Sequence, residues 1–174
     1  MKVLITGIAG TGKSTIIKAL NEKGIEAIDL HDVPDLFFWQ DNKTKEKIPY
    51  TPIHSREWFD TVDRLCDIEK LETMLNQYDD IVMAGTSAGS NQEDFLSHFD
   101  KIILLQASPT TLLHRLTTRV NKSGYGKTKA EQDDNIEWQK EYDPLLISRG
   151  AIPVSTEGQF DDVVNKITKI IKEN

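Results

Sequence analysis

Three glycines, a lysine and a serine near the start of the chain have the spacing of a phosphate-binding loop. Residues 7–14 read Gly-Ile-Ala-Gly-Thr-Gly-Lys-Ser and match the pattern G-x-x-x-x-G-K-[ST]. Glycines permit backbone angles and close approaches that a side chain would block, so successive N–H groups can point at phosphate oxygens. Lys13 can reach the β- and γ-phosphates of a nucleotide, and the Ser14 hydroxyl can ligate Mg²⁺. The pattern predicts that the chain binds a nucleoside triphosphate together with Mg²⁺.

The residues around this loop favour the same interpretation. Val3-Leu4-Ile5 predicts a strand before the loop, and residues 14–20 begin a helix whose N-terminus carries a partial positive charge. The alternative is a glycine-rich turn with an incidental lysine, which this context disfavours. We expect Thr15 to bond the α-phosphate. The residues expected to contact the nucleotide are Gly10, Thr11, Gly12, Lys13, Ser14 and Thr15.

Short apolar runs alternate with longer amphipathic stretches along the chain. Apolar runs without polar alternation are typical of strands covered on both faces, and their alternation with helices favours a parallel sheet. The sequence thus predicts an α/β fold, a sheet with helices on both faces. Strands are expected at residues 3–5, 27–28, 81–84, 102–105 and 152–154, and helices at 13–23, about 55–77, 109–120, 129–147 and 160–172.

Two polar segments, 37–51 and 121–129, do not fit this alternation and are expected to be loops. The second expected helix rests on apolar residues between Trp58 and Leu75 that recur every three or four positions.

The overall composition narrows the classes of function. A chain of 174 residues with 38% hydrophobic content suits one globular domain, and a net charge of −7 makes nucleic-acid binding unlikely to be its general role. Cys66 is the only cysteine, so an internal disulfide is excluded and a reducing cytoplasmic location is expected. The apolar run before Gly7 is too short to span a membrane. We expect a small-molecule ligand and a monomer or homodimer.

The length, the early phosphate loop and an arginine-containing helix after the fourth strand resemble the small P-loop kinases, the superfamily of adenylate, shikimate and gluconate kinases. A GTPase is disfavoured because the nearest string to its base-reading motif, Asn121-Lys122-Ser123-Gly124, lacks the aspartate. The resemblance implies a P-loop three-layer sandwich with a five-stranded parallel sheet of order 2-3-1-4-5. It also implies ATP at the carboxyl ends of the strands and a short lid, here at about residues 121–129.

The same resemblance implies roles for two arginines of the helix before the lid. Arg115 would lie against the adenine ring, and Arg119 would reach the phosphates and stabilise charge on the transferred group. The alternative is a solvated cationic helix face, because arginines four residues apart are common on exposed helices. Residues 155–158 occupy the position where the resembling kinases place a loop that touches adenine.

A carboxylate is also needed near the γ-phosphate, to hold Mg²⁺ or to accept the proton of the acceptor. Residues 85–90, after the third strand, contain no acid. Shikimate-type kinases share this departure and use an aspartate after the second strand, where this chain has Asp29, His31 and Asp32. Asp29 is the expected catalytic carboxylate and metal ligand, and Asp32 is the reserve and a substrate contact. Either aspartate could instead cap the next segment.

Contacts to the acceptor are expected from residues 31–65. Among its aromatic and basic residues, which could stack on a ring or grip an anion, Arg56 is the preferred substrate contact. A flat, nucleoside-like acceptor is one possibility. The candidates are Phe37, Phe38, Trp39, Arg56, Trp58 and Arg64.

The function these features favour is transfer of the γ-phosphoryl of ATP to a hydroxyl or phosphate of a small metabolite, with Lys13, Asp29 and Arg119 as catalytic residues. An alternative is a regulatory ATPase switch that acts on a protein partner. A nucleic-acid end kinase would need a basic groove that the acidic composition does not indicate.

Overall fold

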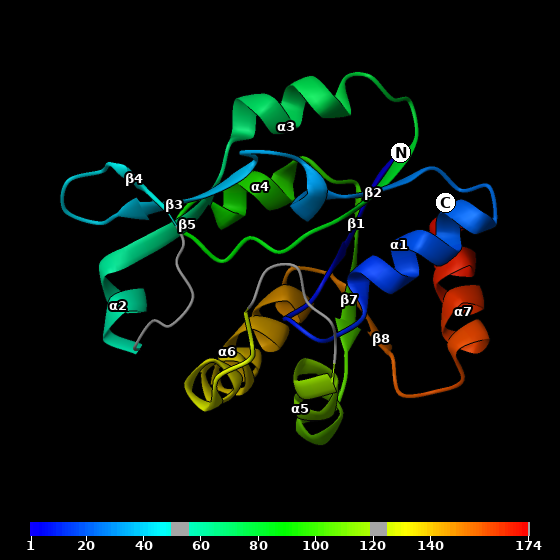
Figure 1. Cartoon of the computed structure of the whole chain (residues 1–174). Coiled ribbons are helices and arrows are strands. Elements are labelled where there is room, and N and C mark those ends of the chain that lie inside the picture. Colours follow the sequence, from blue (N-terminus) through cyan, green and yellow to red (C-terminus); the bar gives the residue numbers. More distant parts are fainter. Residues whose placement is uncertain (50–55, 119–124, 174) are drawn as a thin grey trace.

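Five parallel strands form the central sheet of the protein. The computed structural model describes residues 1–49, 56–118 and 125–173, and its main sheet has the order β2-β6-β1-β7-β8 (Figure 1). Counted along the chain, these strands give the predicted order 2-3-1-4-5, so the predicted P-loop kinase fold is confirmed. The strands are β1 (Lys2–Thr6), β2 (Ala27–Asp29), β6 (Ile81–Ala84), β7 (Lys101–Gln106) and β8 (Ile152–Ser155).

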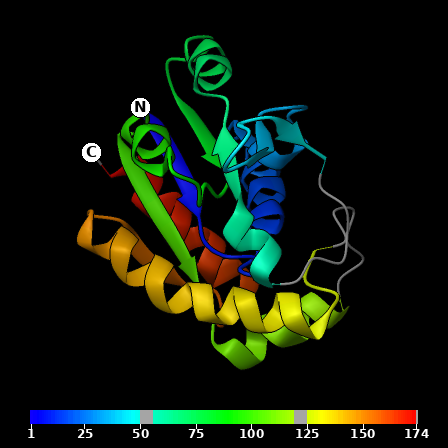
Figure 2. The ribbon, with the colours of Figure 1, turned by 90° about the vertical axis from the view of Figure 1, so that its left-hand side faces the viewer.

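Helices cover both faces of this sheet and make it the middle of three layers (Figure 2). In β1, Val3 and Ile5 belong to one apolar core and Leu4 to the other, because successive side chains of a strand point to opposite faces. The first core holds the apolar sides of α1 (Lys13–Glu22) and α7 (Phe160–Lys172). The second core is covered by α3 (Ile68–Leu75), α4 (Gln92–Ser97), α5 (Pro109–Thr118) and α6 (Lys129–Ser148).

A second sheet, antiparallel and of order β4-β3-β5, is inserted between β2 and β6. The predictions of a loop over 37–51 and of a helix over about 55–77 were wrong here. The first segment contains β3 (Phe37–Asp41) and β4 (Lys47–Ile48), and the second divides into α2 (Arg56–Thr61), β5 (Val62–Cys66) and α3.

The spacing of apolar residues misled the helix prediction because a strand partner far away in sequence decided the outcome. Trp39 of β3 lies directly opposite Arg64 of β5. The helix itself begins only at Ile68, where the Asp67 carboxylate accepts a hydrogen bond from the Lys70 N–H and caps the first turn. The local spacing of apolar residues carries no information about pairing between strands that lie more than twenty residues apart in the sequence.

The remaining helix predictions agree with the structure wherever the chain is described. Two short elements were not predicted, the 3₁₀ turn η1 (Leu30–Asp32) and α4. None of the helices in the described ranges combines the length and the apolar character that crossing a bilayer requires.

Candidate nucleotide-binding site

The loop between β1 and α1 has the backbone that its glycines predict. Gly7 has φ of +142°, and a Cβ atom there would lie 2.5 Å from the backbone oxygen of Leu105 in β7. Gly12 has φ of +98° in the left-handed region, and the space around its Cα is open. A side chain would therefore clash at Gly7 and strain the backbone at Gly12. The first glycine lets the loop pack on the sheet and the last turns the chain into α1.

The N-terminus of α1 has no side-chain cap. Gly12 occupies the cap position and offers no side-chain acceptor to the N–H groups of the first turn. By contrast, Thr128 and Glu131 form a reciprocal capping box at the start of α6. Uncapped N–H groups and the helix dipole together favour an anion at this end of α1.

The side chains of this loop hold its carbonyl groups. Lys13 Nζ donates to the backbone oxygens of Gly7 at 2.6 Å and Ile8 at 3.0 Å. The Thr86 hydroxyl, which follows β6, donates to the same Gly7 oxygen at 2.8 Å. These bonds give the carbonyl oxygens of Gly7 and Ile8 donors from the protein itself. Thr15 is exposed on the first turn of α1.

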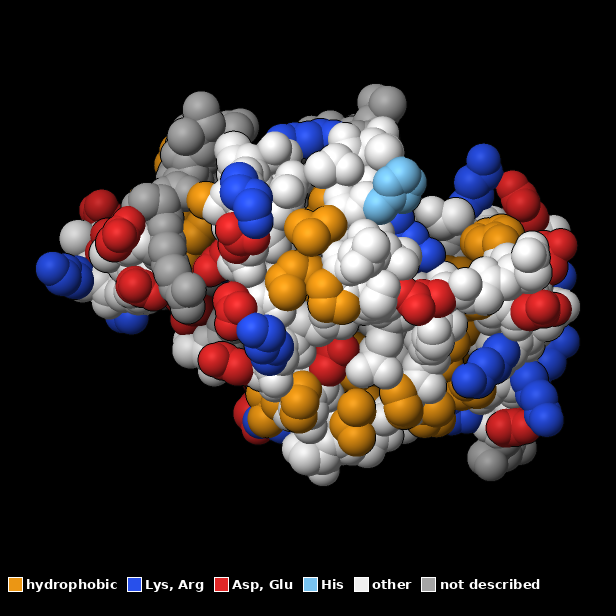
Figure 3. Space-filling view, turned by 90° about the horizontal axis from the view of Figure 1, so that it is seen from below, with side chains coloured by type: hydrophobic (Ala, Val, Ile, Leu, Met, Phe, Trp, Pro, Cys, Tyr) orange, Lys and Arg blue, Asp and Glu red, His pale blue; other side chains and the backbone are white. Residues whose placement is uncertain are grey.

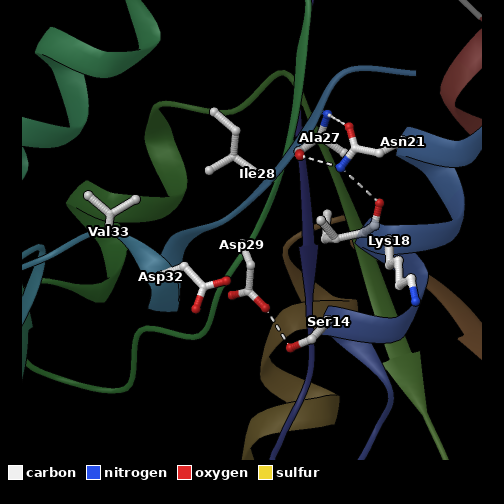
Figure 4. A pocket seen from close by; sticks show the side chains of 9 residues that line it. Ser14, Lys18, Asn21, Ala27, Ile28, Asp29, Asp32 and Val33 are labelled. Carbon is white, nitrogen blue, oxygen red and sulfur yellow. Dashed lines mark hydrogen bonds between the residues drawn. The ribbon is translucent and has the colours of Figure 1, made fainter. Parts of the chain in front are cut away.

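Ser14 and Asp29 meet at the carboxyl end of the sheet. The Ser14 hydroxyl donates to Asp29 Oδ2 at 2.5 Å, and the backbone N–H of His31 donates to Oδ1 at 3.0 Å (Figure 4). Burial raises the pKa of this carboxyl, but hydrogen bonds from His31 and Ser14 outweigh it and hold the pKa at about 2. Asp29 is therefore ionised at neutral pH and stands beside the hydroxyl that the phosphate-loop pattern assigns to Mg²⁺.

His31 and Asp32 lie close to this pair. His31 Nδ1 is 3.3 Å from Asp29 Oδ1, while burial and the positive charges of Arg64 and Lys13 lower its pKa, so the imidazole is neutral at pH 7. Asp32 and Asp29 line one side of a cavity of about 400 Å³ between α1 and β2, and their carboxylates lie near each other in Figure 4.

Arg64 reaches the same region from β5. Its Nη1 donates to the Thr86 backbone oxygen at 2.6 Å, and its guanidinium lies 4.5 Å from the centre of the Phe37 ring. Burial lowers the pKa of Arg64 to about 10, so the group stays protonated at pH 7. No carboxylate in the described ranges pairs with it. A partly buried cation without a counter-ion, next to Lys13 and His31, is suited to an anionic ligand.

Arg115 connects three segments around the loop. Its Nη1 donates to the Thr156 hydroxyl at 2.9 Å and the Gly10 backbone oxygen at 3.3 Å, and its Nη2 donates to the Thr156 backbone oxygen at 2.7 Å. Helix α5, the phosphate loop and the segment after β8 thus meet at one side chain.

Three predicted features cannot be placed. Arg119 and residues 121–124 of the predicted lid lie outside the described residues, as does the side chain of Arg56, the first residue of α2. Of the predicted lid, only residues 125–129 are described.

Several residues that support the site were not predicted. Asn135 and Tyr142 are buried on α6, and their side chains bond Ala9 of the loop and Thr6 of β1. Thr86 was noted only as part of a segment without acids. The sequence did contain a sign of such supporting residues. In 129–147, amides and a tyrosine occupy helix positions at which aliphatic residues are usually buried.

The donor set fits a magnesium nucleotide. One hydroxyl and one or two carboxylates are hard oxygen ligands, and Mg²⁺ in such sites takes most of its other ligands from phosphates and water. The described residues contain no group of three or more His, Cys, Asp or Glu side chains that could hold a metal by itself.

The surface at the carboxyl ends of the strands carries mixed charge. In Figure 3, the visible acidic and basic side chains are interspersed with apolar ones and form no single basic field.

Several solved structures with this fold are kinases of small molecules. A shikimate kinase from Acinetobacter baumannii in complex with shikimate superimposes with a TM-score of 0.61 at 19% identity, over 98% of this chain and 92% of that one. A gluconokinase from Sinorhizobium meliloti 1021 gives 0.58 at 17% identity, over 98% and 90%. A deoxyadenosine kinase from M. mycoides with bound dATP gives 0.56 at 14% identity, over 99% and 100%. At these identities the likeness shows the fold alone.

No curated protein matches the sequence. A family model does: residues 3–137, which include the phosphate loop, Asp29, Arg64 and Arg115, match the model described as an AAA domain. The match covers more than half of the chain, and its N-terminal part is the strand, loop and helix described above. The chain therefore belongs to the AAA domain family, with the architecture of a small P-loop kinase.

Proposed function

We propose that the protein is a kinase that transfers the γ-phosphoryl of ATP to a small-molecule acceptor. The observation that carries the proposal is the meeting of the loop hydroxyl of Ser14 with the ionised Asp29 at the carboxyl end of the sheet. This arrangement places a hydroxyl and a carboxylate together at the uncapped end of α1, where phosphates are favoured.

Each predicted residue has a role in this reaction. N–H groups of residues 10–15 would cradle the phosphates, with the Thr15 hydroxyl on the α-phosphate. Lys13 would exchange its bonds to loop carbonyls for the β- and γ-phosphates. Ser14 and Asp29 would hold Mg²⁺, which when bound neutralises phosphate charge. Arg115 would flank the adenine ring, and Arg119 would stabilise the transferred group.

The acceptor would bind on the side of Asp29 that faces Arg64. Cross-strand partners share a face of a sheet, so Trp39 lies on the same face as Arg64, and Phe37 lies on it two residues away. That face combines a cation with aromatic rings, which suits an acceptor with an anionic group, a flat ring, or both. Asp32 and Arg56 stay candidates for further contacts to the acceptor.

Asp29 is better suited to holding Mg²⁺ than to removing a proton. A carboxyl with a pKa of about 2 is a weak base, and effective general bases have pKa values near the operating pH. Catalysis in phosphoryl transfer comes mainly from positioning and electrostatics.

The three solved kinases support this proposal through their activities and bound ligands. One holds shikimate, one is named for gluconate, and one deoxyadenosine kinase holds dATP. Their acceptors differ, so they support a small acceptor and a nucleotide without selecting among acceptors. Our proposal includes one domain over residues 1–174, a lid at about 121–129, an acceptor region at about 31–65 and a cytoplasmic location.

A coupled assay of ADP release tests the proposal. The chain is incubated with Mg²⁺ and ATP and a panel of sugar acids, nucleosides and nucleotides, with Lys13→Ala as the control. We expect one class of acceptor to raise ADP release above basal hydrolysis, and Lys13→Ala to abolish the increase. Unchanged ATP affinity in Lys13→Ala would refute the nucleotide site, and no stimulation by any acceptor would refute the kinase activity.

A further inference from the structure

The side chain of Asn135 forms two hydrogen bonds with one residue of the phosphate loop. Its Oδ1 accepts from the backbone N–H of Ala9 at 3.2 Å, and its Nδ2 donates to the backbone oxygen of Ala9 at 3.0 Å. Asn135 is 1% exposed. A side-chain amide matches a peptide group in both donor and acceptor, so the pair behaves like one rung of a sheet ladder.

The helix that carries Asn135 is capped at its start, before Asn135, and is bonded to β1 after it. One turn earlier, Glu131 is buried, and its Oε2 accepts from the backbone N–H groups of Gly126, Lys127 and Thr128. Two turns later, the Tyr142 hydroxyl lies 2.8 Å from the Thr6 hydroxyl at the end of β1. Residues spaced in this way lie along one side of a helix. In Figure 2, α6 runs across the carboxyl ends of the strands.

This geometry fixes the part of the loop that would otherwise be free to rotate. Ala9 lies between Gly7 and Gly10, two of the three loop glycines with positive φ, where the backbone is least constrained by its own side chains. With both polar groups of Ala9 bonded to α6, the N–H groups after it keep one orientation. An anion site with preset N–H groups needs less reordering on binding than a flexible loop does.

We propose that Asn135 is a positioning residue that holds the phosphate loop in its triphosphate-binding shape from the helix that follows the lid. The inference rests on the proposed nucleotide site and adds to it a residue far away in sequence. Asn135 acts through Ala9 and need not touch the nucleotide. Glu131 of the same helix binds the N–H groups of residues 126–128, so this segment and the phosphate loop share one support.

Asn135→Ala and Gln139→Ala form a matched pair for the test. Gln139 carries the same amide one turn further along α6, but donates to the backbone oxygen of Ala107 and to Asp143 instead of to the loop. We measure the dissociation constants of Mg²⁺-ATP and of inorganic tripolyphosphate for the whole chain. We expect Asn135→Ala to weaken both by at least 10-fold, and Gln139→Ala to change neither by more than 3-fold.

Tripolyphosphate separates a defect of the loop from a defect of the adenine region. It presents the phosphates without adenosine, so a misplaced loop weakens it and ATP by the same factor. Amide hydrogen exchange gives a readout independent of ligand: exchange at Ala9 should accelerate at least 10-fold in Asn135→Ala and stay unchanged in Gln139→Ala.

Asn135→Asp provides a conservative rescue. Its ionised carboxylate would place a negative oxygen against the backbone oxygen of Ala9, whereas the protonated acid restores a donor there. Tripolyphosphate affinity relative to the wild-type chain should therefore recover as the pH falls from 8 to 5.5, with no recovery in Asn135→Ala.

The outcomes keep this inference distinct from the proposed function. Equal phosphate affinity and equal Ala9 exchange in the wild-type chain and Asn135→Ala would overturn the inference. Weaker phosphate binding in Gln139→Ala by the same factor would also overturn it, by showing a general defect of α6. If phosphate binding follows our expectation but no acceptor stimulates ADP release, the inference stands and the proposed kinase activity fails.

Discussion

The Ser14 hydroxyl donates a 2.5 Å hydrogen bond to the Asp29 carboxylate, and this bond joins the first turn of α1 to the end of β2. The two residues are 15 positions apart in sequence. Both oxygens are ligand types that Mg²⁺ accepts, so metal binding would replace one hydrogen bond with a shared cation. The pair is the most direct point at which to test the candidate site.

Asp29→Asn should weaken the apparent affinity for Mg²⁺ in ADP release by roughly 10- to 100-fold, since a neutral amide replaces a carboxylate that holds or orients the metal. Titration of Mg²⁺ at fixed ATP measures the change. Asp32→Asn is the matched control, because Asp32 lines the same cavity without bonding Ser14. A larger effect at Asp32 than at Asp29 would reverse the assignment of the two carboxylates.

Asp29 should also contribute to the pH dependence of the free energy of unfolding. Its pKa is lowered from 3.8 to about 2 in the folded chain, so its stabilising contribution is complete above the unfolded pKa and is lost as the pH falls from about 4 to 2. We expect Asp29→Asn to lower the free energy of unfolding by about 1–2 kcal/mol at pH 7. Urea denaturation at several pH values should show this difference shrinking below pH 4. A difference that stays constant down to pH 2 would contradict the assigned pKa.

Replacing Arg64 should reduce the proposed kinase activity without a comparable loss of folding stability. Its partly buried guanidinium has no carboxylate partner in the described ranges, so Arg64→Met removes the cost of desolvating an unpaired cation together with one hydrogen bond to the Thr86 carbonyl. Because these two effects oppose each other, we expect Arg64→Met to change the free energy of unfolding by less than about 1 kcal/mol. Acceptor-stimulated ADP release should fall at least tenfold, with ATP affinity unchanged. Full stimulation in this variant would remove Arg64 from the acceptor site.

The parts of the fold that the sequence predicts are those set by local rules. The loop from Gly7 to Ser14 could be predicted because its shape and chemistry depend on the backbone freedom of its glycines and on the Lys-Ser pair, all within a few residues. The five buried runs are readable because both faces of their strands are covered, which removes polar alternation. Asp29 was predicted from its position after the second strand together with the resemblance to shikimate-type kinases, and its meeting with Ser14 follows from parallel strands ending at one edge.

The parts that could not be predicted depend on pairing over long separations. Val62 and Leu65 belong to a strand because β3 lies beside them, whereas their three-residue spacing, continued at Ile68, also suits a helix. Asn135 finds its partner Ala9 126 residues away. No local preference of an asparagine within a helix identifies such a partner, so α6 was predicted as an element and its contacts with the loop were missed.

Cys66 offers a chemical probe of the inserted sheet. Its thiol is 2% exposed, and burial, with the nearby Asp67 carboxylate, raises its pKa to about 12. The thiolate is the form of cysteine that attacks the disulfide of Ellman's reagent, so at pH 8 the folded chain should react at least 100-fold more slowly than the chain in 8 M urea. Cys66 is paired with Phe37 across β3 and β5, and Phe37 lies beneath Arg64. Labelling of the native chain therefore requires local opening of this sheet, and the labelling rate reports how often β3 and β5 separate. Native labelling within tenfold of the urea rate would show that β3 and β5 are not stably paired.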